Sequence, residues 1–282
     1  MNDTIIAKNL SFYFADKQIL NQIDFHVQKG EIFGLLGPSG AGKTTLLKVL
    51  TGQLQPKEGY TELLGKDTRK LSEAERRQIG TMMDNFGLYD RLSVYDNMSF
   101  YADIRHVSRS AINGILKNIG LYEGRSTTVS KLMKNRLSLA RALMNNARIL
   151  FLDEPTAGLD PVTTREIHDI LLKQKKQGTT IFLTTHNMFE AESLCDHVAL
   201  LSKGTIIESG NPSEICRKYN HLNKLQVTLK DGHNITLENG SASAAIVKEY
   251  LENNRIETIH STEPTLETVF IELTGKGLDG YE

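Results

Sequence analysis

The sequence is poor in cysteine, has almost no net charge and contains no long apolar run. Its two cysteines, Cys195 and Cys216, are too few for a disulfide framework in 282 residues, so we expect two free thiols in a reducing cytoplasm. A formal net charge of -1 supplies no basic field that would attract nucleic acid, and we expect no nucleic-acid partner. The longest apolar stretches, such as 149–152 and 198–201, are far shorter than the roughly 20 apolar residues of a membrane span.

The N-terminal residues also lack the basic stretch and apolar run of a signal peptide. We therefore expect a chain without a membrane span of its own, which would serve a membrane only through a separate partner. The apolar and charged fractions, 39% and 24%, are ordinary for a globular protein that buries a core.

Apolar strand-like runs alternate with helical patterns through most of the chain. The runs 32–36, 149–152, 180–185 and 198–201 read as buried strands, and much of 94–145 has helical periodicity. Strands alternating with helices predict an α/β fold with a largely parallel sheet covered on both faces.

The pattern of apolar and polar residues changes after Pro212. Residues 225–229 and 234–237 predict two strands of a hairpin around Asp231-Gly232, and residues 244–251 predict a helix. We expect residues 1–219 to form the main domain and residues 220–282 a small α+β accessory domain.

Residues 37–44 fit the phosphate-binding pattern G-x-x-x-x-G-K-[ST] in full, between a strand and a helix. Glycines let backbone N–H groups approach phosphate without interference from a Cβ atom, and the following helix points its positive end at the same anion. Lys43 can bridge the β- and γ-phosphates, and the Thr44 hydroxyl can ligate Mg²⁺. The predicted nucleotide-binding residues of this loop are Gly37, Pro38, Ser39, Gly40, Ala41, Gly42, Lys43, Thr44 and Thr45.

Two other strand ends carry reactive side chains. Asp153 and Glu154 follow an apolar strand, and because neighbouring residues there point in different directions, Asp153 can face Mg²⁺ while Glu154 faces the attacking water. His186 ends the strand 180–185, which should open onto the sheet edge that holds the phosphates. We expect His186 to contact the γ-phosphate region, with a purely structural histidine as the alternative.

Residues 152–160, Leu-Asp-Glu-Pro-Thr-Ala-Gly-Leu-Asp, resemble the joined Walker B motif and D-loop of ABC ATPases, and His186 matches their switch histidine. This resemblance covers essentially the whole chain. It implies ATP as the nucleotide and a RecA-like sheet with an inserted helical subdomain, here at about residues 86–145. It also implies sandwich dimers, with each ATP held between one chain's P-loop and the other chain's signature motif.

The same resemblance implies roles for individual residues. Glu154 becomes the general base, His186 and Lys43 complete the catalytic set, and the metal site comprises Thr44, Asp84 and Asp153. Asp160 is placed at the dimer interface. Phe14 falls where the family stacks an aromatic ring on adenine, with Tyr13 as the fallback and a core aromatic as the third alternative.

Two positions depart from the family pattern. Asp84 stands where the family has the glutamine of its Q-loop; a carboxylate there can still bind Mg²⁺ or water at the nucleotide site, unless Asp84 is a solvated loop residue. In the segment Val129-Ser-Lys-Leu-Met133, Leu132 replaces a signature glycine and should crowd the partner's phosphate. Ser130 remains as a possible phosphate donor, and residues 136–143 match the family's next helix well.

Residues 263–275 resemble the ending of drug-exporter ABC ATPases of the daunorubicin and bacitracin resistance class. From periodicity alone they predict an amphipathic helix that buries Leu266, Val269, Phe270 and Leu273. The resemblance implies a motor subunit on the cytoplasmic face of the cell membrane, bound peripherally to a separate transmembrane permease subunit. The surface around Phe86, Leu88 and Tyr89 is the predicted coupling surface, with packing on its own domain as the alternative.

Three questions stay open at this level. Leu132 and Asp84 also suit a nucleotide-gated regulatory subunit with weak hydrolysis. A soluble ABC ATPase acting on ribosomes or DNA is a further alternative, although the paired cassettes, coiled coils and zinc motifs usual for such proteins are missing. The second ATPase chain can be another copy of this chain or a different one.

Overall fold

The computed structural model describes residues 3–83, 87–89, 91–121, 131–144, 147–221 and 223–275, with only the backbone of residues 131 and 132. In the part of the chain so described, no helix is both long and apolar enough to cross a membrane.

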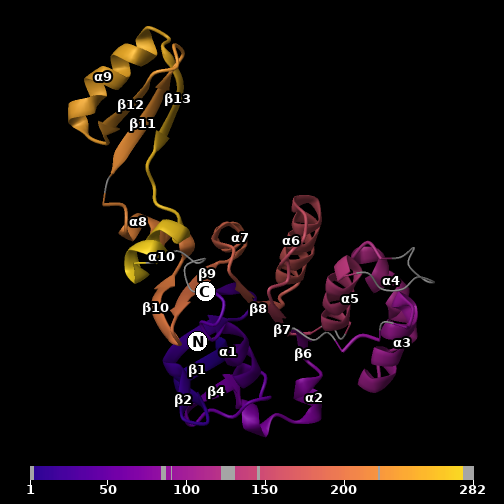
Figure 1. Cartoon of the computed structure of the whole chain (residues 1–282). Helices are drawn as coiled ribbons and strands as arrows, with labels where there is room; N and C mark the ends of the chain where they lie inside the picture. The colour runs from indigo at the N-terminus through magenta and orange to yellow at the C-terminus, as the bar shows by residue number, and fades with distance from the viewer. Residues whose placement is uncertain are drawn as a thin grey trace.

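A six-stranded sheet forms the centre of the molecule (Figure 1). Its strands pair in parallel except for the edge strand β10, which is antiparallel to β9. The inner strands are continuous apolar runs because helices or a second sheet cover both faces. In spatial order the strands are β10 (Thr205–Gly210), β9 (His197–Ser202), β3 (Ile32–Leu36), β8 (Thr180–Thr185), β7 (Ile149–Asp153) and β6 (Ile79–Met82).

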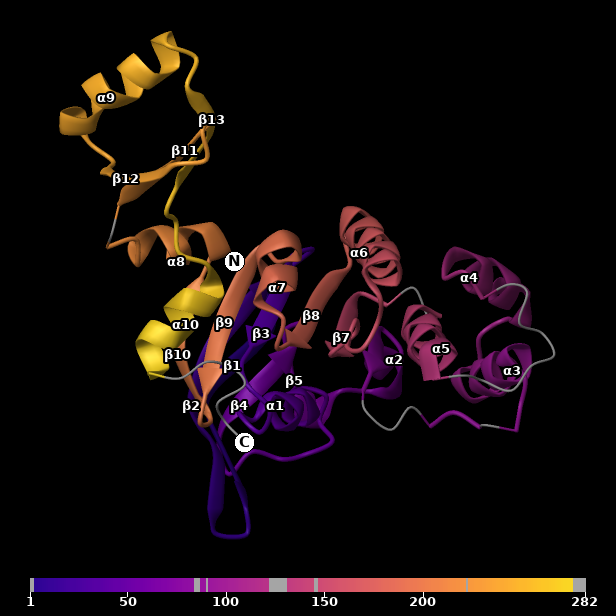
Figure 2. The ribbon, with the colours of Figure 1, turned by 45° about the horizontal axis from the view of Figure 1, so that its top comes forward.

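Four helices lie over one face of this sheet, and Figure 2 shows two of them, α7 and α10, in front of the strands. Their buried side chains join those of the strands in a single apolar cluster. Cys195 and Cys216 are buried in this cluster as free thiols, as expected from the sequence. The helices are α6 (Pro161–Lys176), α7 (Met188–Leu194), α8 (Pro212–Lys218) and α10 (Leu266–Thr274).

The other face is covered by helix α1 (Lys43–Leu50) and by a four-stranded sheet that was not predicted from the sequence. Stacked aromatic rings connect the two sheets: Phe25 lies 5.3 Å from Phe33, and Phe33 lies 5.5 Å from Phe182, between ring centroids. The strands of this second sheet are, in order, β2 (Lys17–Gln28), β1 (Asp3–Phe14), β4 (Glu58–Leu63) and β5 (Lys66–Asp67).

The region predicted to be helical packs around a third apolar cluster, at the right of Figure 1. Ile112, Leu116 and Ile119 are buried there, and Ile115 is partly buried against them. Short helices η1 (Thr68–Lys70) and α2 (Glu73–Arg76) precede β6. The helices of the cluster are α3 (Val94–Arg105), η2 (Arg109–Ala111), α4 (Ile112–Asn118) and α5 (Lys131–Leu143).

The C-terminal region contains the predicted hairpin, β11 (Lys224–Leu229) and β12 (Asn234–Glu238), and the predicted helix α9 (Ser241–Glu252). A third strand that the pattern had not suggested, β13 (Ile256–Ser261), pairs with the other side of β11. The chain then returns to the main body, where α10 lies beside α7 and α8. The division between residues 219 and 220 stays a proposal.

Helix α10 buries three of its four predicted apolar residues. Leu266, Val269 and Phe270 are fully buried, whereas Leu273 is 37% exposed, so its predicted burial was wrong. Leu273 lies in the last turn of α10, directly before the left-handed cap at Gly275.

Candidate active site

The loop between β3 and α1 has the backbone geometry that its glycines predict. Gly40 and Gly42 have φ angles of 77° and 112°, in the left-handed region that side chains disfavour. A Cβ atom on Gly37 would lie 2.3 Å from the carbonyl oxygen of Leu201. These positions therefore require glycine, and the loop passes close to the end of β9.

Lys43 is the first residue of α1 and is buried at the centre of this loop. Its Nζ donates to the carbonyl oxygens of Gly37 at 2.6 Å and Pro38 at 3.2 Å. The same ammonium lies 3.2 Å from Oε1 of Glu154. The lysine is thus held by the loop and by the predicted base, which places its charge where the predicted phosphates would lie.

Thr44 and Asp153 come together as the sequence predicts for a metal site. The Thr44 hydroxyl donates to Oδ2 of Asp153 at 2.8 Å, and Asp153 is 5% exposed. A hydroxyl and a carboxylate are hard oxygen ligands, and Mg²⁺ typically takes one or two such groups together with phosphate and water. The pair therefore fits Mg²⁺.

Thr184 holds the other carboxylate oxygen of Asp153, and the sequence reading had not assigned it a role. Its hydroxyl donates to Oδ1 of Asp153 at 2.5 Å. The signal was present as two adjacent threonines at the end of β8, since successive strand residues point to opposite faces of the sheet. Thr184 is the one that pairs with Asp153 in the β7–β8 register, so these two side chains share a face.

Glu154 and His186 meet at the ends of two neighbouring strands. Nδ1 of His186 lies 2.7 Å from Oε2 of Glu154, and the side chains are 58% and 23% exposed. Glu154 has a φ angle of 48°, and its N–H is shared between the carbonyl and the hydroxyl of Thr184, both at 3.1 Å. This geometry turns the carboxylate out of the strand, between an ammonium and an imidazole and open to water.

Asp160 caps helix α6 in this structure. Its carboxylate accepts from the backbone N–H groups of Val162 and Thr163, both at 3.0 Å, and from the Thr163 hydroxyl at 2.6 Å. These hydrogen bonds, led by that of the hydroxyl, hold the pKa of Asp160 below its usual value. The predicted place of Asp160 at a dimer interface stays a prediction.

Phe14 lies at the tip of the β1–β2 hairpin, and its ring is 51% exposed. It packs edge-on against Phe12 at 4.9 Å between centroids. The fallback residue, Tyr13, has the Lys57 ammonium over its ring at 4.6 Å. Of the two rings Phe14 is thus the more open to a flat ligand, and its role stays a prediction.

The remaining predicted site residues lie partly within and partly outside the described residues. Ser39 and Gly40 are exposed at the loop surface, and Thr45 is half-buried on α1. Asp84 and Ser130 lie outside the described residues. Helix α5 begins at Lys131, so the degenerate signature segment leads directly into it.

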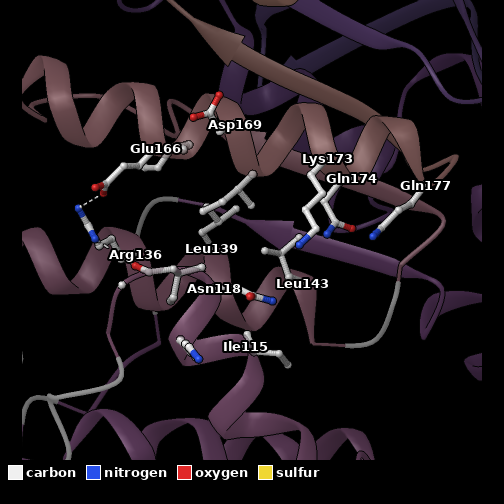
Figure 3. Close-up of a pocket in the computed structure, with 15 residues that line it drawn as sticks. Ile115, Asn118, Arg136, Leu139, Leu143, Glu166, Asp169, Lys173, Gln174 and Gln177 are labelled. Carbon is white, nitrogen blue, oxygen red and sulfur yellow. Dashed lines mark hydrogen bonds and ion pairs between the residues drawn. The ribbon is translucent and has the colours of Figure 1, made fainter.

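A cavity of about 590 Å³ lies away from the P-loop, between helices α4, α5 and α6 (Figure 3). Arg136 on α5 spans one end of it, with its guanidinium 2.7 Å from Oε2 of Glu166 on α6. The same guanidinium donates to the Ile119 carbonyl at 3.1 Å and to the Thr163 hydroxyl at 3.2 Å. Arg136 therefore connects α5 with α6 and with the end of α4 beside this cavity.

Comparison with known proteins points to one family. The family model described as ABC transporter matches residues 20–157. The chain is 37% identical over 286 residues to a fluoroquinolones export ATP-binding protein of Mycobacterium tuberculosis, covering 98% of this chain and 95% of that one. It is 30% identical over 302 residues to the bacitracin transport ATP-binding protein of Enterococcus faecalis, covering 98% of both chains.

Solved structures agree with the fold. A dimeric bacterial ABC transporter cassette superimposes with a TM-score of 0.67 at 25% identity. The match covers 73% of this chain and 98% of the cassette, so this chain contains residues that have no counterpart in the cassette.

Proposed function

Because the chain belongs to the ATP-binding subunits of ABC transporters, and so is an ATPase, we propose that it is the motor subunit of an exporter. In this role it couples ATP binding and hydrolysis to export by a separate membrane subunit. The convergence of Lys43, Glu154 and His186 on one point carries the proposal, since a regulatory binding module needs no positioned base. The names of the two relatives, one for fluoroquinolones export and one for bacitracin transport, support the exporter assignment.

The chemistry follows from the contacts. ATP phosphates take the place of the loop carbonyls and of Glu154 as partners of the Lys43 ammonium, which draws them against the N–H groups of the P-loop. Thr44 and Asp153 would hold Mg²⁺, which would offset phosphate charge. Glu154, released from Lys43, is free to accept a proton from the attacking water, and His186 orients both.

The second chain of the sandwich dimer would close over this site. Two large apolar side chains are strongly exposed beside it: Phe189, three residues after His186, at 78%, and Val162, two residues after Asp160, at 70%. Exposed apolar groups of this size favour contact with another protein surface. Both a homodimer and a heterodimer remain possible occupants, and the dimeric cassette supports pairing as such.

The membrane subunit would contact the helical region near the predicted coupling surface. Tyr89, Phe100 and Ile104 are 50%, 44% and 57% exposed, and the first two rings meet edge-on at 5.0 Å. They line a cavity of about 250 Å³, together with Leu88. Phe86 lies outside the described residues. The cavity is also lined by Asn97 and Arg141, so its wall is both apolar and polar. A hollow edged by exposed apolar side chains suits an inserted amphipathic helix of a partner, which would hold the chain peripherally at the cytoplasmic face of the membrane.

The alternative of a nucleotide-gated subunit with weak hydrolysis rests on Leu132 and Asp84. It differs from the motor proposal in one measurable way, because it binds ATP normally but turns it over slowly even in the assembled complex.

Fractionation of cells tests the partner assignment. The chain should move from the soluble to the membrane fraction when the permease is co-expressed, and the double variant Phe100→Asp, Ile104→Asp should stay soluble. Ile246→Asp, on the 40% exposed residue of helix α9, is the matched control and should bind the membrane fraction like the wild type. A wild-type chain that stays soluble beside every permease candidate contradicts the proposal.

A further inference from the structure

A second carboxylate, Glu190, is buried behind the predicted catalytic pair. It lies on α7 and is 1% exposed. Its Oε1 accepts from the Thr156 hydroxyl at 2.7 Å and lies 3.0 Å from Nε2 of His168, and its Oε2 accepts from the Thr185 hydroxyl at 2.8 Å. Three side chains from three segments therefore converge on one carboxylate.

The contacts show in which form this carboxylate is held. Burial by itself would raise the pKa of Glu190, but hydrogen bonds from His168, Thr156 and Thr185 outweigh it and lower the pKa. An ionised carboxylate only accepts hydrogen bonds, so Nε2 of His168 carries the proton in this contact. Loss of any of these donors would destabilise the folded state, because it would leave a buried charge with too few hydrogen bonds.

The three segments are those that carry the predicted chemistry. Thr156 follows Glu154 by two residues, and Thr185 directly precedes His186. His168 lies on α6, the helix that begins where the segment after Glu154 ends. The two threonines at the end of β8 point to opposite faces of the sheet. Thr184 donates a hydrogen bond to Asp153, and Thr185 donates one to Glu190.

The relative position of Glu154 and His186 depends on the two segments that carry them, although Glu154 also contacts Lys43. Glu154 and His186 are partly exposed, and they sit on different strand ends. Asn187 caps α7 by accepting from the Glu190 N–H at 3.1 Å, and its own N–H donates to the Thr185 hydroxyl at 3.0 Å. The backbone on either side of His186 is therefore tied to the same buried group.

We propose that Glu190 is a positioning residue for ATP hydrolysis, whose buried carboxylate fixes the segment carrying Glu154 relative to the segment carrying His186. It does not touch ATP in this role. The inference rests on the assignment of Glu154 and His186 to hydrolysis, and it adds a group that acts through both of them.

Steady-state hydrolysis by the full-length chain, assembled with its membrane partner, tests the proposal. Glu190→Gln should lower kcat about 10- to 100-fold, because misplacement of catalytic groups by about 1 Å costs up to this much. The affinity for ATP, measured without Mg²⁺ so that no turnover occurs, should stay within about twofold, because the P-loop contacts do not involve Glu190. Thr156→Val should lower kcat in the same sense, and Thr156→Ser, which keeps the hydroxyl, should restore it.

Glu192→Gln is the matched control. Glu192 lies on the same helix, and its carboxylate accepts from the Leu266 N–H at 2.6 Å, so the substitution weakens a structural contact away from the junction. It should lower the melting temperature without lowering kcat per folded molecule. If Glu190→Gln behaves in the same way, the proposal is wrong. If Glu190→Gln does not fold, the Thr156 pair decides by the same criterion.

A double variant separates this proposal from the one it rests on. Adding Glu190→Gln to Glu154→Gln should cause little further loss of turnover, because Glu190 acts by placing Glu154 relative to His186, and this placement loses its effect once the base is absent. Losses that multiply would show an independent role and overturn the proposal. Full activity of Glu154→Gln alone would instead refute the assignment of the base, whatever Glu190 does.

Discussion

Replacing Glu154 by glutamine separates the chemistry of the site from its architecture. Glutamine keeps the size of the side chain and can still hydrogen-bond His186, but it cannot accept the proton of water. Loss of a positioned base lowers rates about 10²- to 10⁴-fold. On the scale of the barrier this is about 2.7–5.5 kcal/mol.

The effect on stability should be much smaller. The substitution removes the ion pair between Glu154 and Lys43, whose atoms are 3.2 Å apart. Because the Glu154 side chain is 23% exposed, the pair is partly screened and contributes about 0–1 kcal/mol. Lys43 keeps its two loop carbonyls as partners, so the melting temperature should fall by no more than about 4 °C.

Three measurements on the assembled complex check this reasoning: phosphate release, equilibrium binding of ATP and thermal unfolding. Glu73→Gln makes the same chemical change on the surface helix α2, where Glu73 pairs with Arg77, and should leave turnover unchanged. Lys43→Ala should abolish ATP binding itself. Turnover of Glu154→Gln within about twofold of the wild type, with Lys43→Ala inactive, would show that another group is the base.

Further outcomes follow from other parts of the molecule. Phe270→Ala should destabilise the chain by about 3–5 kcal/mol in denaturant unfolding, because the ring is fully buried between α10 and the sheet, and a loss below about 1 kcal/mol would contradict this packing. Cys195 and Cys216 should react slowly with a thiol reagent at pH 8 in the native state and fast in denaturant, because burial raises the pKa of both thiols, that of Cys216 to about 11. Fast native labelling would contradict it. Phe14→Ala should weaken ATP binding about 5- to 100-fold if the ring stacks on adenine, since stacking on an aromatic ring contributes about 1–3 kcal/mol, and unchanged affinity would leave Tyr13 as the candidate. Leu132→Gly should raise turnover of a homodimer about 10²-fold if the leucine crowds the partner's phosphate, and no change in affinity or turnover in any assembly would end that argument.

Local sequence determined the phosphate loop and the strand ends. Glycines at residues 37, 40 and 42 are required by close approach or by positive φ angles. The glycine pattern in the sequence therefore predicts the conformation of the loop directly. Asp153, Glu154 and His186 were predicted as site residues because each lies at the end of an apolar strand, and the structure brings them to a common edge of the sheet. The hairpin at 224–238 likewise followed from its turn residues.

Tertiary structure decided what covers each apolar face and which distant groups meet. Periodicity marked four apolar residues of α10, but it could not tell that the packing of this helix beside α7 and α8 leaves Leu273 partly exposed. The pairing of β1 with β4 and of β11 with β13 joins segments far apart along the chain, which no local pattern encodes. The local sequence gives Glu190 no distinguishing mark, because its burial and its three partners arise only when β7, β8, α6 and α7 are assembled.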